Sequence, residues 1–140
     1  MSRRVQREQI FKLLFRVEFN TIEEMPEQLR LFFEQADEPI SEEDADYISR
    51  KYEKIMEKLP EIDKLLNEKT EKWSTDRMGK AELTILRVAV YEILFDEEIP
   101  TGVAINEAVE LAKRYATAED ASFINGILGS LARSFEGAGE

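Results

Sequence analysis

The 140-residue sequence contains no cysteine and no histidine, and these two absences remove several classes of chemistry. Thiolate catalysis, disulfide bonds and zinc sites built from cysteine or histidine are excluded. Catalysis by a Ser-His-Asp triad, or by a histidine acting as a general base, is excluded as well. The absence of disulfides fits a reducing compartment, so we expect a cytoplasmic protein.

Glycine, proline and long apolar runs are also scarce. Six glycines and four prolines offer few tight turns, which disfavours a β-sandwich or a β-barrel. The N-terminus carries charge but no apolar stretch behind it, unlike a signal peptide. No stretch approaches 18 uninterrupted apolar residues, so we expect neither a membrane span nor a membrane partner.

Charge is abundant, but it is distributed unevenly along a chain whose formal net charge is −11. Through residue 16 there are five basic residues and one acidic residue, whereas residues 18–46 hold eleven acidic residues and one basic residue. Such an inversion fits an N-terminus that binds a polyanion. It equally fits a solvated helix end whose basic side chains bind nothing. The five basic residues are Arg3, Arg4, Arg7, Lys12 and Arg16.

Apolar residues recur at helical spacing in almost every segment, which predicts an all-α protein of about seven helices in a compact bundle. Pro60 suits a first helical turn and so predicts that a separate helix begins there. We expect residues 1–136 to form one domain and residues 137–140 to be a frayed tail. The expected helices cover about residues 6–19, 21–33, 41–59, 60–73, 81–95, 103–115 and 119–135.

Three helix starts carry a capping pattern, in which a hydroxyl residue is followed three positions later by a carboxylate. These pairs are Thr21 with Glu24, Ser41 with Asp44, and Thr117 with Asp120.

Residues 81–95 are apolar nearly all round, which predicts a central, buried helix. We therefore expect Arg87 to pair with a carboxylate from a neighbouring helix, and we interpret Asn106 and Glu107 as structural in the same way. Gly126 lies inside a helical pattern, where glycine costs about 0.5–1 kcal/mol relative to alanine. Either a neighbouring helix or the backbone of a ligand approaches it closely, and we favour the helix.

Motifs for catalysis or for metal binding are missing. Gly79-Lys80 lacks the remaining residues of a phosphate-binding loop. The acidic run at residues 42–46 lacks the spacing of a calcium-binding EF-hand and fits a first helical turn better. We expect no enzymatic activity, no cofactor, no metal site and no small-molecule substrate.

Five sequence blocks occur in a fixed order between the N-terminus and residue 128. They are Arg3-Arg4-x-x-Arg7-Glu8 with Leu14-Phe15, Trp73-x-x-x-Arg77, Ile85-Leu86-Arg87-Val88-Ala89-Val90-Tyr91-Glu92, Ile99-Pro100-x-x-Val103-Ala104-Ile105-Asn106-Glu107-Ala108-Val109-Glu110-Leu111-Ala112-Lys113, and Phe123-Ile124-Asn125-Gly126-Ile127-Leu128. In combination they resemble the NusB family of bacterial transcription antitermination factors.

The resemblance implies an all-helical fold of two subdomains. It also implies binding to boxA, a single-stranded RNA element in the leader transcripts of ribosomal RNA operons, together with the ribosomal protein NusE. That pair would join RNA polymerase and the other Nus factors and help the polymerase to read through terminators.

Position by position, the resemblance assigns Arg3, Arg4 and Arg7 to the RNA-binding segment and Phe123 to base contact. Ser122, beside Phe123, stands where some members carry a lysine, and we include it in the expected RNA site. The short basic segment and this serine make us expect weak binding to RNA without NusE.

Two acidic residues are implied to face the protein partner. Glu82 matches a position on the NusE-facing surface, and Glu119 precedes the last helix near the same composite site. Two other interpretations remain. One is a protein-binding helical scaffold without RNA contact. The other is a detached module related to the N-terminal domain of ribosomal RNA cytosine methyltransferases, which the absence of a cofactor-binding domain disfavours.

Overall fold

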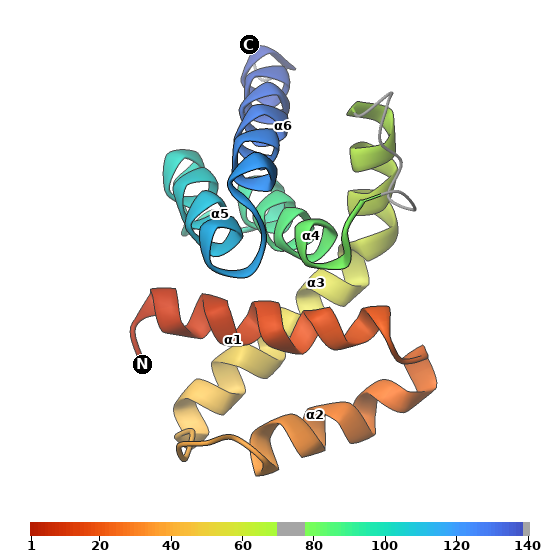
Figure 1. Ribbon diagram of the computed structural model, residues 1–140, viewed down its shortest axis with the longest axis vertical. Helices are drawn as coiled ribbons and strands as arrows, with labels where there is room; N and C mark the ends of the chain where they lie inside the picture. Colours follow the sequence, from red (N-terminus) through yellow and green to blue (C-terminus); the bar gives the residue numbers. More distant parts are fainter. Residues whose placement is uncertain (70–77, 139–140) are drawn as a thin grey trace. The chain divides into compact units, whose positions relative to one another are not determined.

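The computed structural model describes residues 1–69 and 78–138, and every regular element in these ranges is helical (Figure 1). Six α-helices and two short 3-10 helices are present there, so the predicted all-α class is confirmed. The chain divides into two compact units, residues 1–57 and residues 58–140, in keeping with the two helical subdomains that the resemblance implies.

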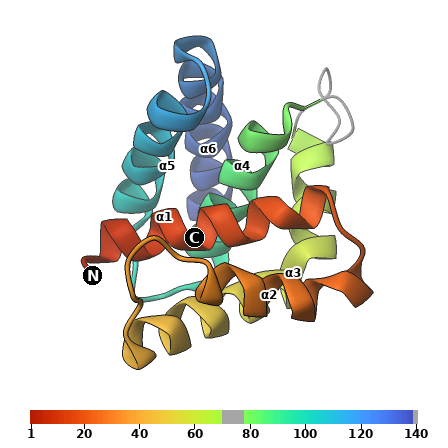
Figure 2. The same ribbon diagram turned by 60° about the horizontal axis from the view of Figure 1, so that its bottom comes forward.

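The first unit contains α1 (Arg3–Phe15), the 3-10 helices η1 (Arg16–Glu18) and η2 (Ile22–Glu24), α2 (Met25–Glu34) and the start of α3 (Figure 2). Each of α1, α2 and α3 buries one face of apolar side chains, because residues three or four positions apart lie on the same side of a helix. They include Leu13, Leu14, Ile48 and Ile55, which are fully buried, and Met25 and Phe32 on α2.

The predicted caps of this unit are confirmed. The Thr21 hydroxyl accepts a hydrogen bond from the Glu24 N–H at 3.3 Å, and a Glu24 carboxylate oxygen accepts one from the Thr21 N–H at 2.9 Å. The Ser41 hydroxyl accepts from the Asp44 N–H at 3.1 Å, which satisfies a donor in the first turn of α3.

The helix break predicted at Pro60 is wrong. α3 (Glu42–Lys69) runs through Pro60 and belongs to both units. Proline removes one backbone donor and costs about 3 kcal/mol in a helix interior, but its fixed φ still suits a helix. Ile55, Ile62 and Leu66 are fully buried on α3, and this burial offsets the cost. The predicted continuation toward residue 73 lies outside the described residues.

The second unit contains the remainder of α3 with α4 (Lys80–Phe95), α5 (Thr101–Tyr115) and α6 (Ala118–Ala138). α4 packs against α5 and α6, and α5 lies along α6 (Figure 1). Alanines line the buried side of α5, which lets the neighbouring helices approach closely. Deeply buried residues of the three helices include Ile85, Leu86, Val90, Ala104, Ala108, Ala112, Ile124 and Leu128.

Arg87 pairs as predicted with a carboxylate from another helix. Its Nε donates to Oδ1 of Asp63 at 2.9 Å, and its second guanidinium nitrogen donates to Oδ2 at 2.8 Å. This two-pronged contact joins α4 to α3 within the second unit and accounts for a charge in the most apolar helix. By contrast, Asn106 is exposed, so the prediction of a buried structural contact is wrong for that residue.

The interpretation of Gly126 on α6 also differs from the structure. A Cβ atom added to Gly126 would meet nothing within 4 Å, so no helix packs against it among the described residues, and the close-packing interpretation is wrong. α6 extends through Ala138, and the frayed tail at residues 137–140 stays a prediction. Residues 139–140 of the predicted tail, and the Trp73-x-x-x-Arg77 block, lie outside the described residues.

Candidate functional site

The basic N-terminus forms the first turns of α1. Ser2 caps this helix by accepting a hydrogen bond from the Val5 N–H at 3.2 Å. Arg3 and Arg4 are exposed, whereas Arg7 is 8% exposed and therefore buried. Arg3 and Arg7 continue the helical stripe of Ile10 toward the N-terminus, and this spacing predicts basic turns that project beyond the core. This prediction is wrong for Arg7, because the buried face of α1 begins one turn earlier than the apolar pattern does.

Arg3 is held in place by contacts within the first unit. Its guanidinium carbon lies over the ring of Tyr47 at 4.2 Å from the centroid, and a guanidinium nitrogen donates to the Gln6 side-chain oxygen at 2.8 Å. The Gln6 side-chain nitrogen in turn donates to Asp44 Oδ1 at 2.8 Å. Asp44 Oδ2 accepts from the N-terminal ammonium of Met1 at 3.3 Å. The sequence did not predict this network, because its two halves are separated by about forty residues.

The other candidate residues lie at the start of α6. Thr117 and Asp120 form the predicted capping pair, with the Asp120 N–H donating to the Thr117 hydroxyl at 3.0 Å. Glu119 and Ser122 are exposed, and Phe123 is half-buried. The phenylalanine, the serine and the acidic residue thus share the first two turns of one helix.

Glu82 is buried, although the resemblance implies a position on the NusE-facing surface. It is 8% exposed, and it forms a side-chain hydrogen bond with Asp120. Burial and then this contact raise the pKa of Glu82 to about 7, while the bond from Glu82 lowers the pKa of Asp120. The two carboxyl groups therefore share one proton near neutral pH. Sequence reasoning identified Asp120 as a cap but missed it as the partner of Glu82.

The structure thus assembles the candidate residues into two groups. Arg3, Arg4 and Arg7 belong to the first unit, and Glu82, Glu119, Ser122 and Phe123 belong to the second.

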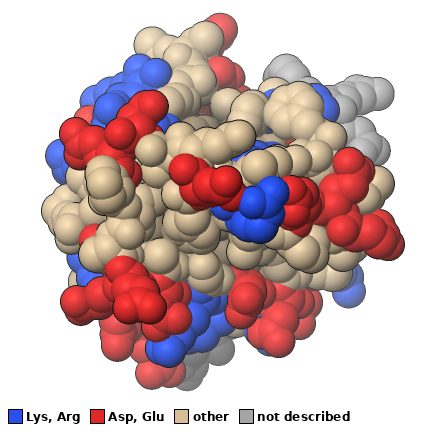
Figure 3. All heavy atoms as spheres, turned by 90° about the horizontal axis from the view of Figure 1, so that it is seen from below, with Lys and Arg blue, Asp and Glu red and all other residues tan. Residues whose placement is uncertain are grey.

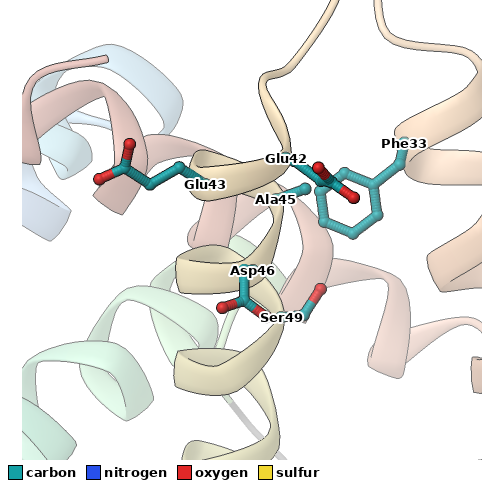
Figure 4. A pocket seen from close by; sticks show the side chains of 6 residues that line it. All are labelled: Phe33, Glu42, Glu43, Ala45, Asp46 and Ser49. Atoms are coloured by element: carbon teal, nitrogen blue, oxygen red, sulfur yellow. The ribbon is translucent and has the colours of Figure 1, made fainter.

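Acidic side chains dominate other parts of the surface, as the net charge requires, and Figure 3 shows several groups of them on one face. An open pocket of about 660 Å³ lies in the first unit between α2 and the start of α3. Figure 4 shows the Phe33 ring beside Glu42, with Asp46 and Ser49 farther along α3 and Glu43 directed away. Three carboxylates and no basic residue line the pocket, so it repels a polyanion.

Within the described parts of the chain, no group of three or more acidic residues is arranged to hold a metal ion. None of the helices described combines the length and apolar character that crossing a membrane requires.

Comparison with solved structures defines the class of fold. The chain superimposes on T. maritima NusB with a TM-score of 0.82 and 37% identity, over 95% of this chain and 92% of that one. It also superimposes on a structure of the antitermination factors NusB and NusE in complex with dsRNA, with a TM-score of 0.81. That chain is 24% identical, so this likeness concerns the fold alone. The architecture is the two-unit helical fold of NusB.

Sequence comparison identifies the family. The NusB family model matches residues 4–133. The transcription antitermination protein NusB of Agathobacter rectalis is 48% identical over 94% of this chain and all of its own length. That of Lachnoclostridium phytofermentans is 48% identical over 91% of this chain and 96% of its own length. The chain belongs to the NusB family, as its sequence blocks predicted.

Proposed function

We propose that this chain is an RNA-binding transcription antitermination factor that recognises boxA in ribosomal RNA leader transcripts together with NusE. In this role it joins RNA polymerase and the other Nus factors and helps the polymerase to read through terminators. The observation that carries the proposal is the 48% identity with transcription antitermination proteins over nearly the whole chain. A chain of the same fold occurs in the solved complex of the antitermination factors NusB and NusE with dsRNA, which further supports an association with NusE and RNA.

The first unit supplies the cations for this function. The exposed Arg3 and Arg4 contact RNA phosphates, and the buried Arg7 adds its charge to the same part of α1. Phe123 offers part of its ring to a base, with the exposed Ser122 beside it. Few cations on a chain of net charge −11 bind RNA weakly, so a partner that adds contacts to the same RNA is required.

Glu119 remains the candidate contact for the protein partner because its carboxylate is exposed. Glu82 is buried against Asp120, so we propose that it acts on the partner surface by supporting the start of α6.

A titration of fluorescent boxA-like RNA tests the proposal, with and without NusE, at two salt concentrations. We expect tight binding only with NusE. Removal of one phosphate-binding cation should flatten the logarithmic salt dependence by about 0.7. Arg4→Ala should therefore weaken binding several-fold and reduce the slope by about that amount.

Arg30→Ala is the matched control, since Arg30 is an exposed arginine of the same unit that pairs with Glu27 and Glu34. It should bind as the unsubstituted chain does. RNA of scrambled sequence should bind much more weakly than boxA. If NusE binds but RNA never does, the protein-binding scaffold is the better description.

A further inference from the structure

Two cationic side chains, Arg3 and Lys51, lie close to the ring of Tyr47. We propose that Arg3 and Tyr47 form a stacking platform for one nucleobase of the bound RNA, and that Gln6 and Asp44 hold this platform in place. The inference rests on the proposed function, because it needs RNA as the ligand. Tyr47 and Asp44 lie on α3, outside both the N-terminal segment and the start of α6, to which the RNA contacts were assigned.

The first argument is the geometry of the arginine. Its guanidinium carbon lies over the Tyr47 ring, 4.2 Å from the centroid, which is the distance of a cation stacked on an aromatic face. A guanidinium group is planar, so the face turned away from Tyr47 is flat, and Arg3 is exposed. Nucleobases of single-stranded RNA stack on aromatic rings and on guanidinium planes. The flat outer face of Arg3 therefore suits stacking against a base, and its positive charge favours the electron-rich face of the base.

The second argument is that positive charge gathers at this ring within a strongly acidic unit. Lys51, one turn along α3 from Tyr47, places its ammonium group 5.4 Å from the same ring centroid. A base stacked on Arg3 would have its phosphate within reach of cations, as binding of a single strand requires. The acidic pocket of the same unit offers no such combination.

The third argument is the way the arginine is fixed. Gln6 receives a hydrogen bond from Arg3 and donates one to Asp44, both at 2.8 Å. Asp44 also accepts hydrogen bonds from the Met1 ammonium and from the Ser41 hydroxyl at 3.0 Å. A long side chain usually loses conformational freedom when it binds. Here that freedom is already restricted before RNA arrives, which favours binding.

The test uses the chain with NusE and a boxA-like RNA, together with a series of the same RNA in which one nucleotide at a time lacks its base. Arg3→Lys keeps the charge but removes the plane, and Tyr47→Leu removes the ring. Each should weaken binding of the intact RNA roughly fivefold or more, as removal of one stacked base does. The salt dependence of Arg3→Lys should stay unchanged. Both effects should disappear on the one RNA whose missing base is the stacked one.

Two controls separate stacking from a structural effect. Tyr47→Phe keeps the ring and should bind as the unsubstituted chain does. Arg50→Lys makes the same exchange at an exposed arginine of the same unit that pairs with Asp46 at 2.9 Å, and it should change nothing. Because Arg3 is exposed, Arg3→Lys remains informative even if Tyr47→Leu fails to fold.

The outcomes distinguish the two proposals. If the unsubstituted chain binds no RNA with NusE present, the proposed function and the platform both fail. If it binds, but Arg3→Lys binds equally well, the platform alone fails. Equal weakening on every RNA of the series would likewise overturn base stacking.

Discussion

At the scale of single residues, the buried polar side chains of the second unit are the most informative. Arg87 is predicted to pair with a carboxylate, and it donates two hydrogen bonds to Asp63. The prediction is confirmed because burying a guanidinium without a partner would cost several kcal/mol of folding free energy, so a buried arginine is found with a carboxylate. Glu82 could not be predicted in the same way, since its burial depends on how α6 begins beside it. Its neighbour Asp120 is itself acidic, so a shared proton takes the place of an ion pair.

This shared proton makes stability depend on pH. The pKa of Glu82 is raised to about 7 in the folded chain, above its unfolded value, so folding favours the protonated form. Stability at this site is full below the unfolded pKa and falls as pH rises through about 7. The lowered pKa of Asp120 has the opposite effect on stability. Its contribution is lost only in acid, as the pH falls below the ordinary pKa of an aspartate. The chain has no histidine, so few other side chains titrate between pH 5 and 8.

We expect Glu82→Gln to remove this pH dependence. Urea unfolding at pH 5 to 8 should show a loss on the order of 2 kcal/mol for the unsubstituted chain and almost none for Glu82→Gln. Glu119→Gln is the control, because Glu119 is an exposed acid on the same turn of α6 as Asp120. An equal slope in Glu82→Gln would contradict the shared proton.

At the scale of the helices, periodicity and capping predicted the elements well. Every predicted capping pair is present, because each hydroxyl accepts a hydrogen bond from a backbone N–H only three residues away. The predictions at Pro60 and Gly126 are wrong for one common reason. A local propensity of a few kcal/mol is outweighed by burial along a long helix, and the sequence alone does not show which side is buried.

Gly126 allows a direct test on α6. No glycine in the described residues has a positive φ, and an added Cβ here would meet nothing within 4 Å. Gly126→Ala should therefore raise the free energy of unfolding by about 0.5–1 kcal/mol. Thermal unfolding measures this change in stability. Gly102→Ala serves as a comparison, because Gly102 is also open but lies in the first turn of α5.

The same variant bears on the alternative that a ligand approaches Gly126. A stabilised Gly126→Ala chain that binds RNA and NusE normally would leave the glycine without a binding role. A stabilised chain with weakened binding would favour the ligand. A destabilised chain would contradict the open environment described for this position.

At the scale of the whole molecule, the distribution of charge affects the rate of the proposed association with RNA. The net charge of −11 opposes association with a polyanion, while the arginine contacts proposed on α1 would favour it locally. Glu42 and Glu43, in the first turn of α3, belong to the same unit as Arg3. Fields of this kind change association rates most at low salt and fade beyond a Debye length of about 8–10 Å at physiological salt.

Replacing both acids, as Glu42→Gln with Glu43→Gln, should speed association of boxA-like RNA with the NusE-loaded chain about twofold at 50 mM salt and hardly at 300 mM. Stopped-flow fluorescence measures the rates. The matched control replaces the exposed pair Glu97 and Glu98 of the second unit. If neither double variant changes the rate at low salt, acidic repulsion does not limit association.

Spacing along the chain was enough to predict the helical class, the helix caps, a carboxylate partner for Arg87 and the family. Which polar side chains are buried, and which distant residues come into contact, became known from the packing of the helices. This packing buried Arg7 and Glu82 and brought Arg3 over Tyr47. Such contacts join residues about forty positions apart, and the energy that selects them comes from packing of helix faces, which local pattern does not encode.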